Sequence, residues 1–456
     1  MNNNARPHDQ GVLKLALPLI FSFWLRAAFQ WVDTIYASSL DSLGDASIAA
    51  IGLTAPFEFL MIACWVGTSS GLTSRLAAAM GAGEGRKIEQ LKVATRRIVG
   101  HLRIVFLLLA VGLWFGADHL VADKDVAQQF KLYGPVLLAG SGITAFWSVL
   151  PDSIVKAHND MRSTMWAGVI STLTNFALNT VFVFVFHWGI LGIGLATVLA
   201  RLSGLAYALG RARMHEDRRL ALAEDNKPGL FEKPTKAILQ LSVPAGLSFG
   251  LLALEGIAIN YMLTKQTDSS ALLAAWSIVD RAGRFLTMPV VAIGVALLPL
   301  CARLWGARDL QRIQRELRTG LKLCVGYSLL FAMPLTILLG PFVSRALTDA
   351  PEAQEAAKHG LRLISLAVLF GGPMFMLRST FDGMQMPRPG FVVSSLRTIV
   401  FVLPLATLGM HFAPNFGLAQ VEGLVLGVSL ATGMATILLL LWMRAFLREE
   451  LSEEAQ

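Results

Sequence analysis

The stretch LKLALPLIFSF (residues 13–23) returns later in the chain as LQLSVPAGLSF (residues 239–249), so that Pro18 aligns with Pro244. The same displacement of about 226 residues aligns further segments along the chain. These further pairs are 77–89 with 302–314, 159–165 with 384–390 and, more loosely, 189–196 with 415–424. Weak similarity that stays in register over such a length indicates an internal duplication, so the sequence predicts two structurally equivalent halves.

Both halves consist mainly of apolar segments. The chain has 456 residues, of which 54% are hydrophobic, and its mean hydropathy is +0.58. Runs of about 20 apolar residues, enough to cross ~30 Å of hydrocarbon, recur along its whole length. We predict twelve spans, at 12–38, 46–79, 98–117, 130–151, 164–187, 189–211, 236–263, 270–301, 320–345, 360–384, 391–411 and 416–443. These spans leave no room for a separate soluble domain.

The charged residues are divided unequally between the connections. The net charge is +8, but the N-terminal tail and every second connection hold 25 Lys and Arg residues, against five in the alternate connections. This bias follows the positive-inside rule and predicts that both termini lie in the cytoplasm. The first apolar segment is also much longer than the core of a signal peptide, so we expect it to remain in the mature protein. The basic character therefore reflects membrane topology, and we expect no nucleic-acid partner.

An even number of spans in each half fixes how the halves are related. Six spans return the chain to the side from which it started, so both halves enter the membrane in the same direction. The predicted fold is an all-α membrane protein of twelve transmembrane helices, in two parallel six-helix lobes related by a pseudo-two-fold axis along the membrane normal. The expected divisions are an N-lobe at 1–211, a cytoplasmic linker at 212–235 and a C-lobe at 236–456.

Asp33 is the most informative polar residue, because it lies in the first apolar segment together with Arg26 and Gln30. A carboxylate at the centre of a membrane helix costs roughly 2.5–3.5 kcal/mol on insertion scales, so it is kept where it faces a cavity or a partner. Asn175 and Asn179 are one helical turn apart on one face of the fifth span. A carboxylate with amide and hydroxyl oxygens suits a proton or Na⁺.

Several segments resemble, in order and spacing, those of the multidrug and toxic compound extrusion (MATE) transporters of bacteria. They are VDTIYASSL…LGDASIAAIGL (32–53), GLTSRLAAAMGAGEGRKI (71–88), KAHNDMRSTM (156–165), NFALNTVFVFVFHWGILGIGLATVLA (175–200) and PVVAIGVALLPLCARLWGAR (289–308). His158 and Met161 depart from the family pattern. The resemblance covers both halves. It implies the MATE fold, shared with the wider MOP group, and a multi-pass protein of the bacterial inner (plasma) membrane.

The resemblance also implies a cation-coupling site in the N-lobe. The matching positions are Asp33, Asn175, Asn179 and Thr197, which form a candidate site for H⁺ or Na⁺. Some relatives carry a second acid where this chain has Asn179, so the identity of the ion stays open. Three alternatives remain: a salt bridge from Asp33 to Arg26, hydrogen bonding of the two asparagines between helices, and bonding of the threonine hydroxyl to its own helix backbone.

Glu255 matches a family acid on the C-lobe side. We expect it to act alone, as a counter-charge for substrate or as a proton site, with pairing to a nearby arginine as the alternative. Arg26, Gln30, Glu58 and Arg284 are supporting candidates, although Arg284 follows Asp280 at i,i+4 spacing, which favours mutual neutralisation.

The expected function is cation-coupled (H⁺ or Na⁺) antiport that exports small organic compounds, cationic and amphipathic in character, by alternating access. No Walker motif is present, no catalytic constellation stands out and no cofactor is expected, so the chain is not predicted to be an enzyme. Its expected partners are its substrates and membrane lipid, and it is expected to be a monomer. The alternatives are a lipid-linked oligosaccharide flippase of a related family and a membrane subunit without transport activity.

Overall fold

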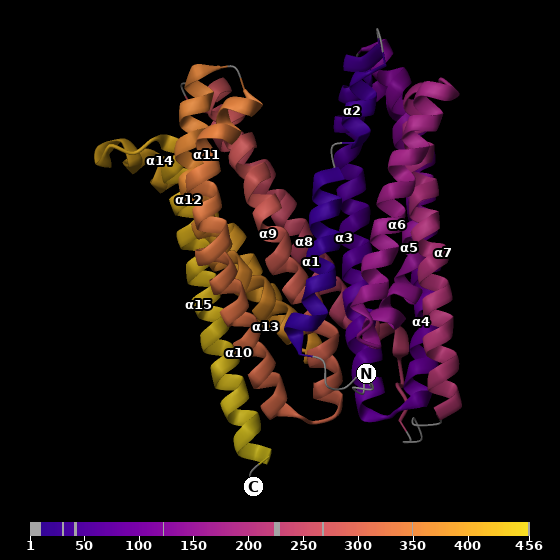
Figure 1. Cartoon of the computed structure of the whole chain (residues 1–456). Coiled ribbons are helices and arrows are strands. Elements are labelled where there is room, and N and C mark those ends of the chain that lie inside the picture. Colours follow the sequence, from indigo (N-terminus) through magenta and orange to yellow (C-terminus); the bar gives the residue numbers. More distant parts are fainter. Residues whose placement is uncertain are drawn as a thin grey trace, which may run out of the picture. The chain divides into compact units, whose positions relative to one another are not determined.

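The structure, a computed structural model, describes residues 11–29, 32–40, 43–121, 123–222, 229–266, 269–348 and 350–454, and the chain is helical over most of these residues (Figure 1). The first half contains α1 (Val12–Phe29), α2 (Val32–Ser38), α3 (Gly44–Ala82), α4 (Gly85–Leu120), α5 (Lys124–Ala157), α6 (Met161–Thr180), the π-helical turn η3 (Val181–Val185) and α7 (Gly189–Leu222). The second half contains α8 (Pro234–Thr264), α9 (Ser269–Gly306), α10 (Leu310–Tyr327), η4 (Ser328–Ala332), α11 (Met333–Leu347), α12 (Pro351–Gly383), α13 (Pro387–Ser395), η5 (Leu396–Val402), α14 (Leu403–Phe412), η6 (Ala413–Phe416) and α15 (Gln420–Glu454).

Among the described residues, twelve helical segments are long and apolar enough to cross a membrane. They follow the order of the twelve predicted spans, which confirms the predicted number. Four spans combine several elements: α1 with α2, α6 with η3, α10 with α11 through η4, and α13 with α14 and η6 through η5. A π-helical turn widens the helix locally and disturbs its hydrogen-bond ladder, and such turns occur often at functional sites.

Several helices extend well beyond the predicted spans. α4 begins at Gly85 rather than near residue 98, and α10 begins at Leu310 rather than near residue 320. The side chain of Asp309 caps α10 by accepting a hydrogen bond from the backbone N–H of Arg312 at 3.0 Å. These first turns are rich in charge, so a hydropathy window marks only the part of each helix that lies in hydrocarbon.

The chain divides into two compact units, each considered by itself. Unit 2 is Phe21–Gly246, and unit 1 combines Met1–Ile20 with Leu247–Gln456. The boundaries therefore fall inside α1 and α8, whereas the predicted lobes change at the linker. Within unit 1 the backbone N–H of Val12 donates to Glu316 at 2.8 Å, and within unit 2 Arg75 donates to the carbonyl of Ala237 at 3.0 Å. The predicted lobes stay a prediction.

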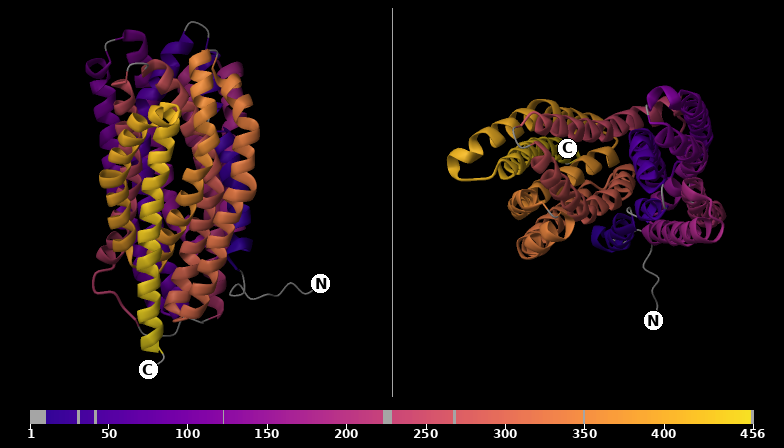
Figure 2. Two further views of the ribbon diagram at one scale, coloured as in Figure 1. Left: turned by 90° about the vertical axis from the view of Figure 1, so that its left-hand side faces the viewer. Right: turned by 90° about the horizontal axis from the view of Figure 1, so that it is seen from above.

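The same packing plan appears inside both units. In unit 2, α5 packs against α3, α4 and α7. In unit 1, α12 packs against α9, α15 and the span formed by α10 and α11. The long helices within each unit run lengthwise beside one another (Figures 1 and 2). Counted within its own half, the fourth span thus contacts the second, third and sixth spans in both units, as the internal duplication predicts.

Two helices of unit 1 approach each other unusually closely. A Cβ atom added to Gly423 on α15 would lie 2.1 Å from the carbonyl oxygen of Gly409 on α14. A Cβ atom on Gly427 would lie 2.2 Å from the carbonyl oxygen of Leu405. Both positions exclude any residue with a side chain, and small residues are what allow helix backbones to touch in membranes.

Candidate cation-binding site

Three helices of unit 2 bring together the four residues predicted to bind a cation. α2 supplies Asp33, α6 supplies Asn175 and Asn179, and α7 supplies Thr197. Asn179 Nδ2 donates to Asp33 Oδ1 at 2.8 Å, and Thr197 Oγ1 donates to Asp33 Oδ2 at 2.9 Å. Asn175 Nδ2 in turn donates to Thr197 Oγ1 at 3.0 Å. The four side chains therefore form one connected hydrogen-bond network.

Only neutral groups donate to the Asp33 carboxylate within the part of the chain that the structure describes. Arg26 forms no ion pair with it there, so the predicted alternative of an Arg26–Asp33 salt bridge is wrong for these residues. Gln30, the other supporting candidate on this segment, lies outside the described residues. The charge of Asp33 is thus hydrogen-bonded without being compensated by a cationic side chain.

Asn179 carries an orphaned acceptor. Its side chain is fully buried, and its Nδ2 group faces the oxygens of Asp33 and Asn175, at 2.8 Å and 3.3 Å. The amide oxygen on the opposite side, Oδ1, accepts no hydrogen bond from any described residue. A buried polar atom without a partner is rare and requires an explanation, of which a bound ion is one.

The Thr197 hydroxyl has two acceptors but a single hydrogen. Besides Asp33, it lies 3.2 Å from the backbone carbonyl oxygen of Ile193, one turn earlier on α7. It can therefore donate to the carboxylate in one rotamer of the hydroxyl hydrogen and to its own helix in the other. A cation that neutralises Asp33 would favour the second arrangement, which turns a lone pair of Thr197 toward Asp33.

An ion pair lies one helical turn along α7 from Thr197. Arg201 pairs with Glu58 of α3, and both side chains are 27% exposed. Because the two charges cancel, the supporting candidate Glu58 does not add a free negative charge beside Asp33.

Tyr36 and Thr180 also line this region and were not singled out from the sequence. The Tyr36 hydroxyl lies 2.6 Å from Thr180 Oγ1, and its ring packs against Phe176 and Phe184. Tyr36 lies three residues after Asp33, and Thr180 directly follows Asn179. Their adjacency to the predicted residues was the available signal.

Glu255 on α8 of unit 1 does not act alone, contrary to the main expectation for it. Arg397 donates to both of its carboxylate oxygens, at 2.5 Å and 2.9 Å, and Thr398 donates at 3.2 Å. Arg397 also donates from Nε to Thr432 on α15 at 3.0 Å. Glu255 is 8% exposed and its charge is already neutralised, which matches the predicted alternative of pairing with an arginine.

Arg284 behaves as its spacing indicated. Its guanidinium lies 2.6 Å from Asp280, one turn earlier on α9, and its side chain is 66% exposed. The predicted mutual neutralisation is confirmed.

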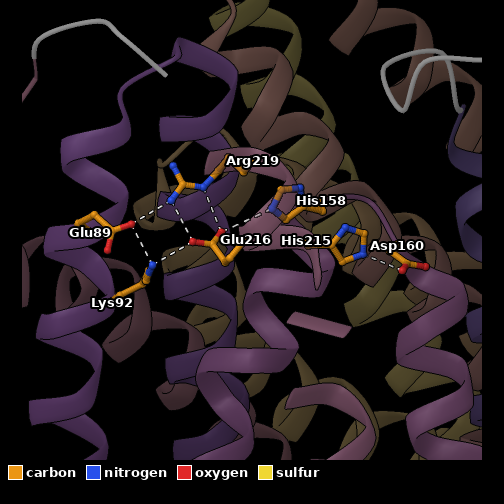
Figure 3. Close-up of polar contacts among 7 residues, drawn as sticks. All are labelled: Glu89, Lys92, His158, Asp160, His215, Glu216 and Arg219. Carbon is orange, nitrogen blue, oxygen red and sulfur yellow. Dashed lines mark hydrogen bonds and ion pairs between the residues drawn. The ribbon is translucent and has the colours of Figure 1, made fainter. Parts of the chain in front are cut away.

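A second polar cluster in unit 2 joins α4, α7 and the turn between α5 and α6 (Figure 3). We call it the paired-histidine cluster; its members are Glu89, Lys92, His158, Asp160, His215, Glu216 and Arg219. The rings of His158 and His215 stack with centroids 4.8 Å apart and 12° between their planes. His215 Nε2 lies 2.9 Å from Asp160, and His158 Nε2 lies 3.7 Å from Glu216. Each imidazole thus faces its own carboxylate.

Asp160 is held by several donors at once. It caps α6 by accepting from the backbone N–H of Ser163 at 3.1 Å, and Arg211 donates to it at 2.8 Å. Burial favours the neutral carboxyl and raises its pKa, but the hydrogen bonds from His215, Ser163 and Arg211 outweigh burial and hold the pKa of Asp160 well below its usual range. This carboxylate therefore stays charged at neutral pH.

Glu216 plays the corresponding part on the other side of the histidine stack. Lys92 and Arg219 each reach it at 2.9 Å, and both also contact Glu89 at 2.9 Å. The cluster fastens three elements of unit 2 to one another. Among the described residues no group of three or more His, Cys, Asp or Glu is arranged to hold a metal ion.

Comparison with known proteins gives one family model that matches the chain twice. The MatE model matches residues 18–181 and residues 244–408. The second match begins 226 residues after the first, the same displacement as the internal duplication.

Relatives that align over more than three quarters of this chain carry transporter or drug-resistance names. The chain is 22% identical to the FAD transporter of Shewanella oneidensis, with 93% of each protein covered. It is 24% identical to the probable multidrug resistance protein NorM of Synechocystis sp., covering 89% of this chain and 91% of the relative. It is 24% identical to the probable multidrug resistance protein YoeA of Bacillus subtilis, covering 78% of this chain and 77% of the relative.

Solved structures share the fold. The chain resembles the Vibrio cholerae MATE transporter VcmN in its bent form, with a TM-score of 0.82, 22% identity and coverage of 96% of this chain and 97% of that one. It resembles a MATE protein in complex with MaL6 with a TM-score of 0.84, 18% identity and coverage of 99% and 100%. The predicted fold class is confirmed.

Proposed function

The chain belongs to the MatE family of multidrug efflux transporters, and we propose that it is an antiporter in which H⁺ or Na⁺ binds at Asp33 and drives the export of small organic compounds. MatE transporters are coupled to cations. The proposal assigns the coupling site to Asp33, Asn175, Asn179 and Thr197 in this chain.

The observation that supports this assignment best is the combination of an uncompensated carboxylate with a buried, unpartnered amide oxygen. Asp33 is hydrogen-bonded only by neutral groups among the described residues, and Asn179 Oδ1 has no donor among them. A carboxylate in a membrane segment gains most from a bound cation when no arginine or lysine neutralises it. Oxygen ligands of this kind suit a hard monovalent cation or a proton.

The network supports a simple account of coupling. Without a cation the site carries one negative charge, and with H⁺ or Na⁺ bound it is neutral. A ligand shifts a conformational equilibrium only through its different affinity for the two states. We infer that burial of Asp33 differs between the inward-open and outward-open states, so that the charge of the site selects between them.

The energy of one cation is sufficient for useful export. We propose that both termini face the cytoplasm, since the 25 Lys and Arg residues of the N-terminal tail and every second connection, against five in the other connections, follow the positive-inside rule. One charge that moves through ~100 mV releases about 2.3 kcal/mol. Because roughly 1.4 kcal/mol corresponds to a tenfold ratio, this supports close to a fortyfold substrate gradient.

We propose organic cations of amphipathic character as the main substrate class, in keeping with the family. A flavin dinucleotide is the second candidate, because one relative that aligns over 93% of the chain is an FAD transporter. Membership in the MatE family speaks against the two earlier alternatives, an oligosaccharide flippase and a membrane subunit without transport activity.

The test is flux through purified protein in liposomes. Export of a fluorescent organic cation and of FAD is measured under an imposed pH gradient and then under an imposed Na⁺ gradient. Asp33→Asn is compared with Asp118→Asn, which changes a carboxylate that is 64% exposed and pairs with Lys131. We expect one gradient to drive flux in wild type and in Asp118→Asn, and no gradient to drive it in Asp33→Asn. Undiminished flux in Asp33→Asn would refute the site.

A further inference from the structure

A surface pocket of unit 2 lies between α4 and the first turns of α8. Its volume is about 700 Å³, and its charged lining consists of Arg97, Lys233 and Lys236. Thr235 and Gln240 add uncharged polar groups, and Leu239 adds an apolar one. No carboxylate lines it among the residues that the structure describes. We call it the basic pocket.

The wall formed by the segment before α8 is fixed to α4. Gln90 on α4 accepts a hydrogen bond from the backbone N–H of Phe231 at 2.8 Å and donates to its carbonyl oxygen at 3.2 Å. The Phe231 ring also lies 5.2 Å from the ammonium nitrogen of Lys87 and 5.8 Å from the guanidinium of Arg75. Lys233 is therefore held near Arg97 by contacts that do not depend on a ligand.

The cations of the basic pocket lack the counter-charges that their neighbours possess. On α4, Lys87 pairs with Glu84 at 2.8 Å and Lys92 pairs with Glu216 at 2.9 Å. Within the described chain, none of the three pocket cations forms an ion pair. Three like charges around one hollow repel each other, so an anion that enters gains interactions with all of them.

The pocket continues into apolar surface along α4. Val93, Ile104 and Leu108 are 51%, 57% and 67% exposed. Val93 lies four residues before Arg97, and Ile104 and Leu108 lie seven and eleven residues after it. These spacings place all three on the same face of the helix as Arg97. On α8, Leu239 and Val243 are 38% and 51% exposed. The predicted apolar spans begin at residues 98 and 236, so the cations stand where hydrocarbon is expected to begin.

We propose that the basic pocket binds the phosphate headgroup of an anionic phospholipid, whose acyl chains lie along the exposed apolar face of α4. Basic pockets between membrane helices are suited to acidic lipid headgroups. The position of the cations beside this apolar face favours a lipid over a free phosphate, because a lipid whose headgroup enters the pocket can lay its acyl chains along the face, whereas a soluble anion contacts the cations alone. The proposal uses the membrane-spanning fold and no part of the transport mechanism.

The experiment measures lipid binding by purified protein in mixed micelles that contain phosphatidylglycerol or phosphatidylcholine. A cation near a membrane surface contributes about fivefold to binding of an acidic lipid. We expect phosphatidylglycerol to bind about a hundredfold more tightly than phosphatidylcholine through three cations. The variant Arg97→Gln/Lys233→Gln/Lys236→Gln is expected to lose this preference.

A matched control removes the same charge elsewhere in unit 2. Arg96, Arg213 and Arg218 are exposed and do not line the pocket, so Arg96→Gln/Arg213→Gln/Arg218→Gln should keep the preference. An equal loss in both variants would show a general charge effect and overturn the proposal. Displacement of phosphatidylglycerol by equimolar inorganic phosphate would also overturn it, in favour of a soluble anion. If the triple pocket variant fails to fold, Lys236→Gln alone is expected to weaken phosphatidylglycerol binding about fivefold, and unchanged binding would contradict the site.

Discussion

Asp33 in unit 2 and Glu255 in unit 1 are both carboxylates within membrane-spanning helices, but their surroundings differ in charge. Asp33 accepts hydrogen bonds from an amide and a hydroxyl, at 2.8 Å and 2.9 Å. Glu255 accepts two hydrogen bonds from one guanidinium, at 2.5 Å and 2.9 Å, and a third from Thr398. The first carboxylate keeps a net charge, and the second belongs to a neutral pair.

This difference is why we propose Asp33, and not Glu255, as the carboxylate that responds to an ion gradient. A mobile cation that binds Glu255 would compete with Arg397, which is covalently part of the site and makes a bidentate contact. A cation that binds Asp33 displaces no charge and only reorients neutral dipoles. Burial of an acid is therefore a poor guide to coupling unless the charge of its partners is known.

The largest expected effect is a difference in export rate between variants of Asp33 and variants of Glu255. Asp33→Asn should lower gradient-driven export by at least about a hundredfold, because the charge that we propose binds the cation is lost. The double variant Glu255→Gln/Arg397→Gln removes both members of a neutral pair and should export within about threefold of wild type. Initial rates in proteoliposomes, normalised to the amount of folded protein, check this. Equal losses of export in the two variants would contradict the proposal that Asp33, and not Glu255, couples export to the cation.

The next effect concerns stability. Arg397→Gln leaves Glu255 buried without its counter-charge and should lower the free energy of unfolding by about 3–5 kcal/mol. The double variant with Glu255→Gln should recover most of that loss, since no buried charge remains. Denaturant unfolding in detergent measures both variants. A double variant as unstable as Arg397→Gln alone would mean that packing, rather than charge, explains the pair.

A smaller effect distinguishes the neutral donors of the two sites. Asn179→Leu removes the hydrogen bond to Asp33 and the unpartnered oxygen, so the cation concentration for half-maximal export should rise about tenfold, or ~1.4 kcal/mol. Thr398→Val removes a donor from Glu255, which Arg397 still holds, and should leave that concentration unchanged. Titration of export against the coupling cation compares the two. A shift in Thr398→Val alone would reverse the assignment.

The smallest effect extends the comparison to Asp160, a carboxylate outside the spans that has cationic partners. Its folded-state pKa lies below its unfolded value, because the hydrogen bonds from His215, Ser163 and Arg211 outweigh burial. The stabilisation is therefore complete above the unfolded pKa of about 3.9 and is lost as the pH falls through the folded pKa. Asp160→Asn should destabilise the protein at pH 7 by about 1 kcal/mol and by less at pH 2, where the unfolded carboxyl is already protonated. Thermal unfolding at both values tests this, and Asp118→Asn serves as the control for an exposed acid.

The sequence was sufficient to predict which side chains lie beside Asp33, because these residues carry local signals, while their binding of a cation stays a proposal. Asn175 and Asn179 share a helix face, Asp33 is conspicuous in apolar sequence, and the MATE-like motifs fix their relation to Thr197. Hydropathy was likewise sufficient to count the spans, since it reports directly on transfer into hydrocarbon.

The partners that were missed are distant in sequence and have no pattern to join them. Arg397 is 142 residues from Glu255, so the sequence does not indicate which arginine pairs with this acid. Only the contact between α8 and the span that contains η5 shows it. His158 and His215 meet through the approach of α7 to the turn before α6, and their separation resembles no ligand motif. The charged first turns of α4 and α10 escaped detection because they project past the apolar segment.

The contact between α14 and α15 has a practical consequence for measuring motion. Their backbones meet at Gly409, Gly423 and Gly427 with no side chain between them. Neither helix can therefore slide along the other by a change of side-chain rotamers. Spectroscopic labels at the exposed positions Leu408 and Leu430 should therefore report the same distance throughout a transport cycle. This pair of positions would supply a fixed reference distance, against which changes in the distance between other pairs of labels can be calibrated.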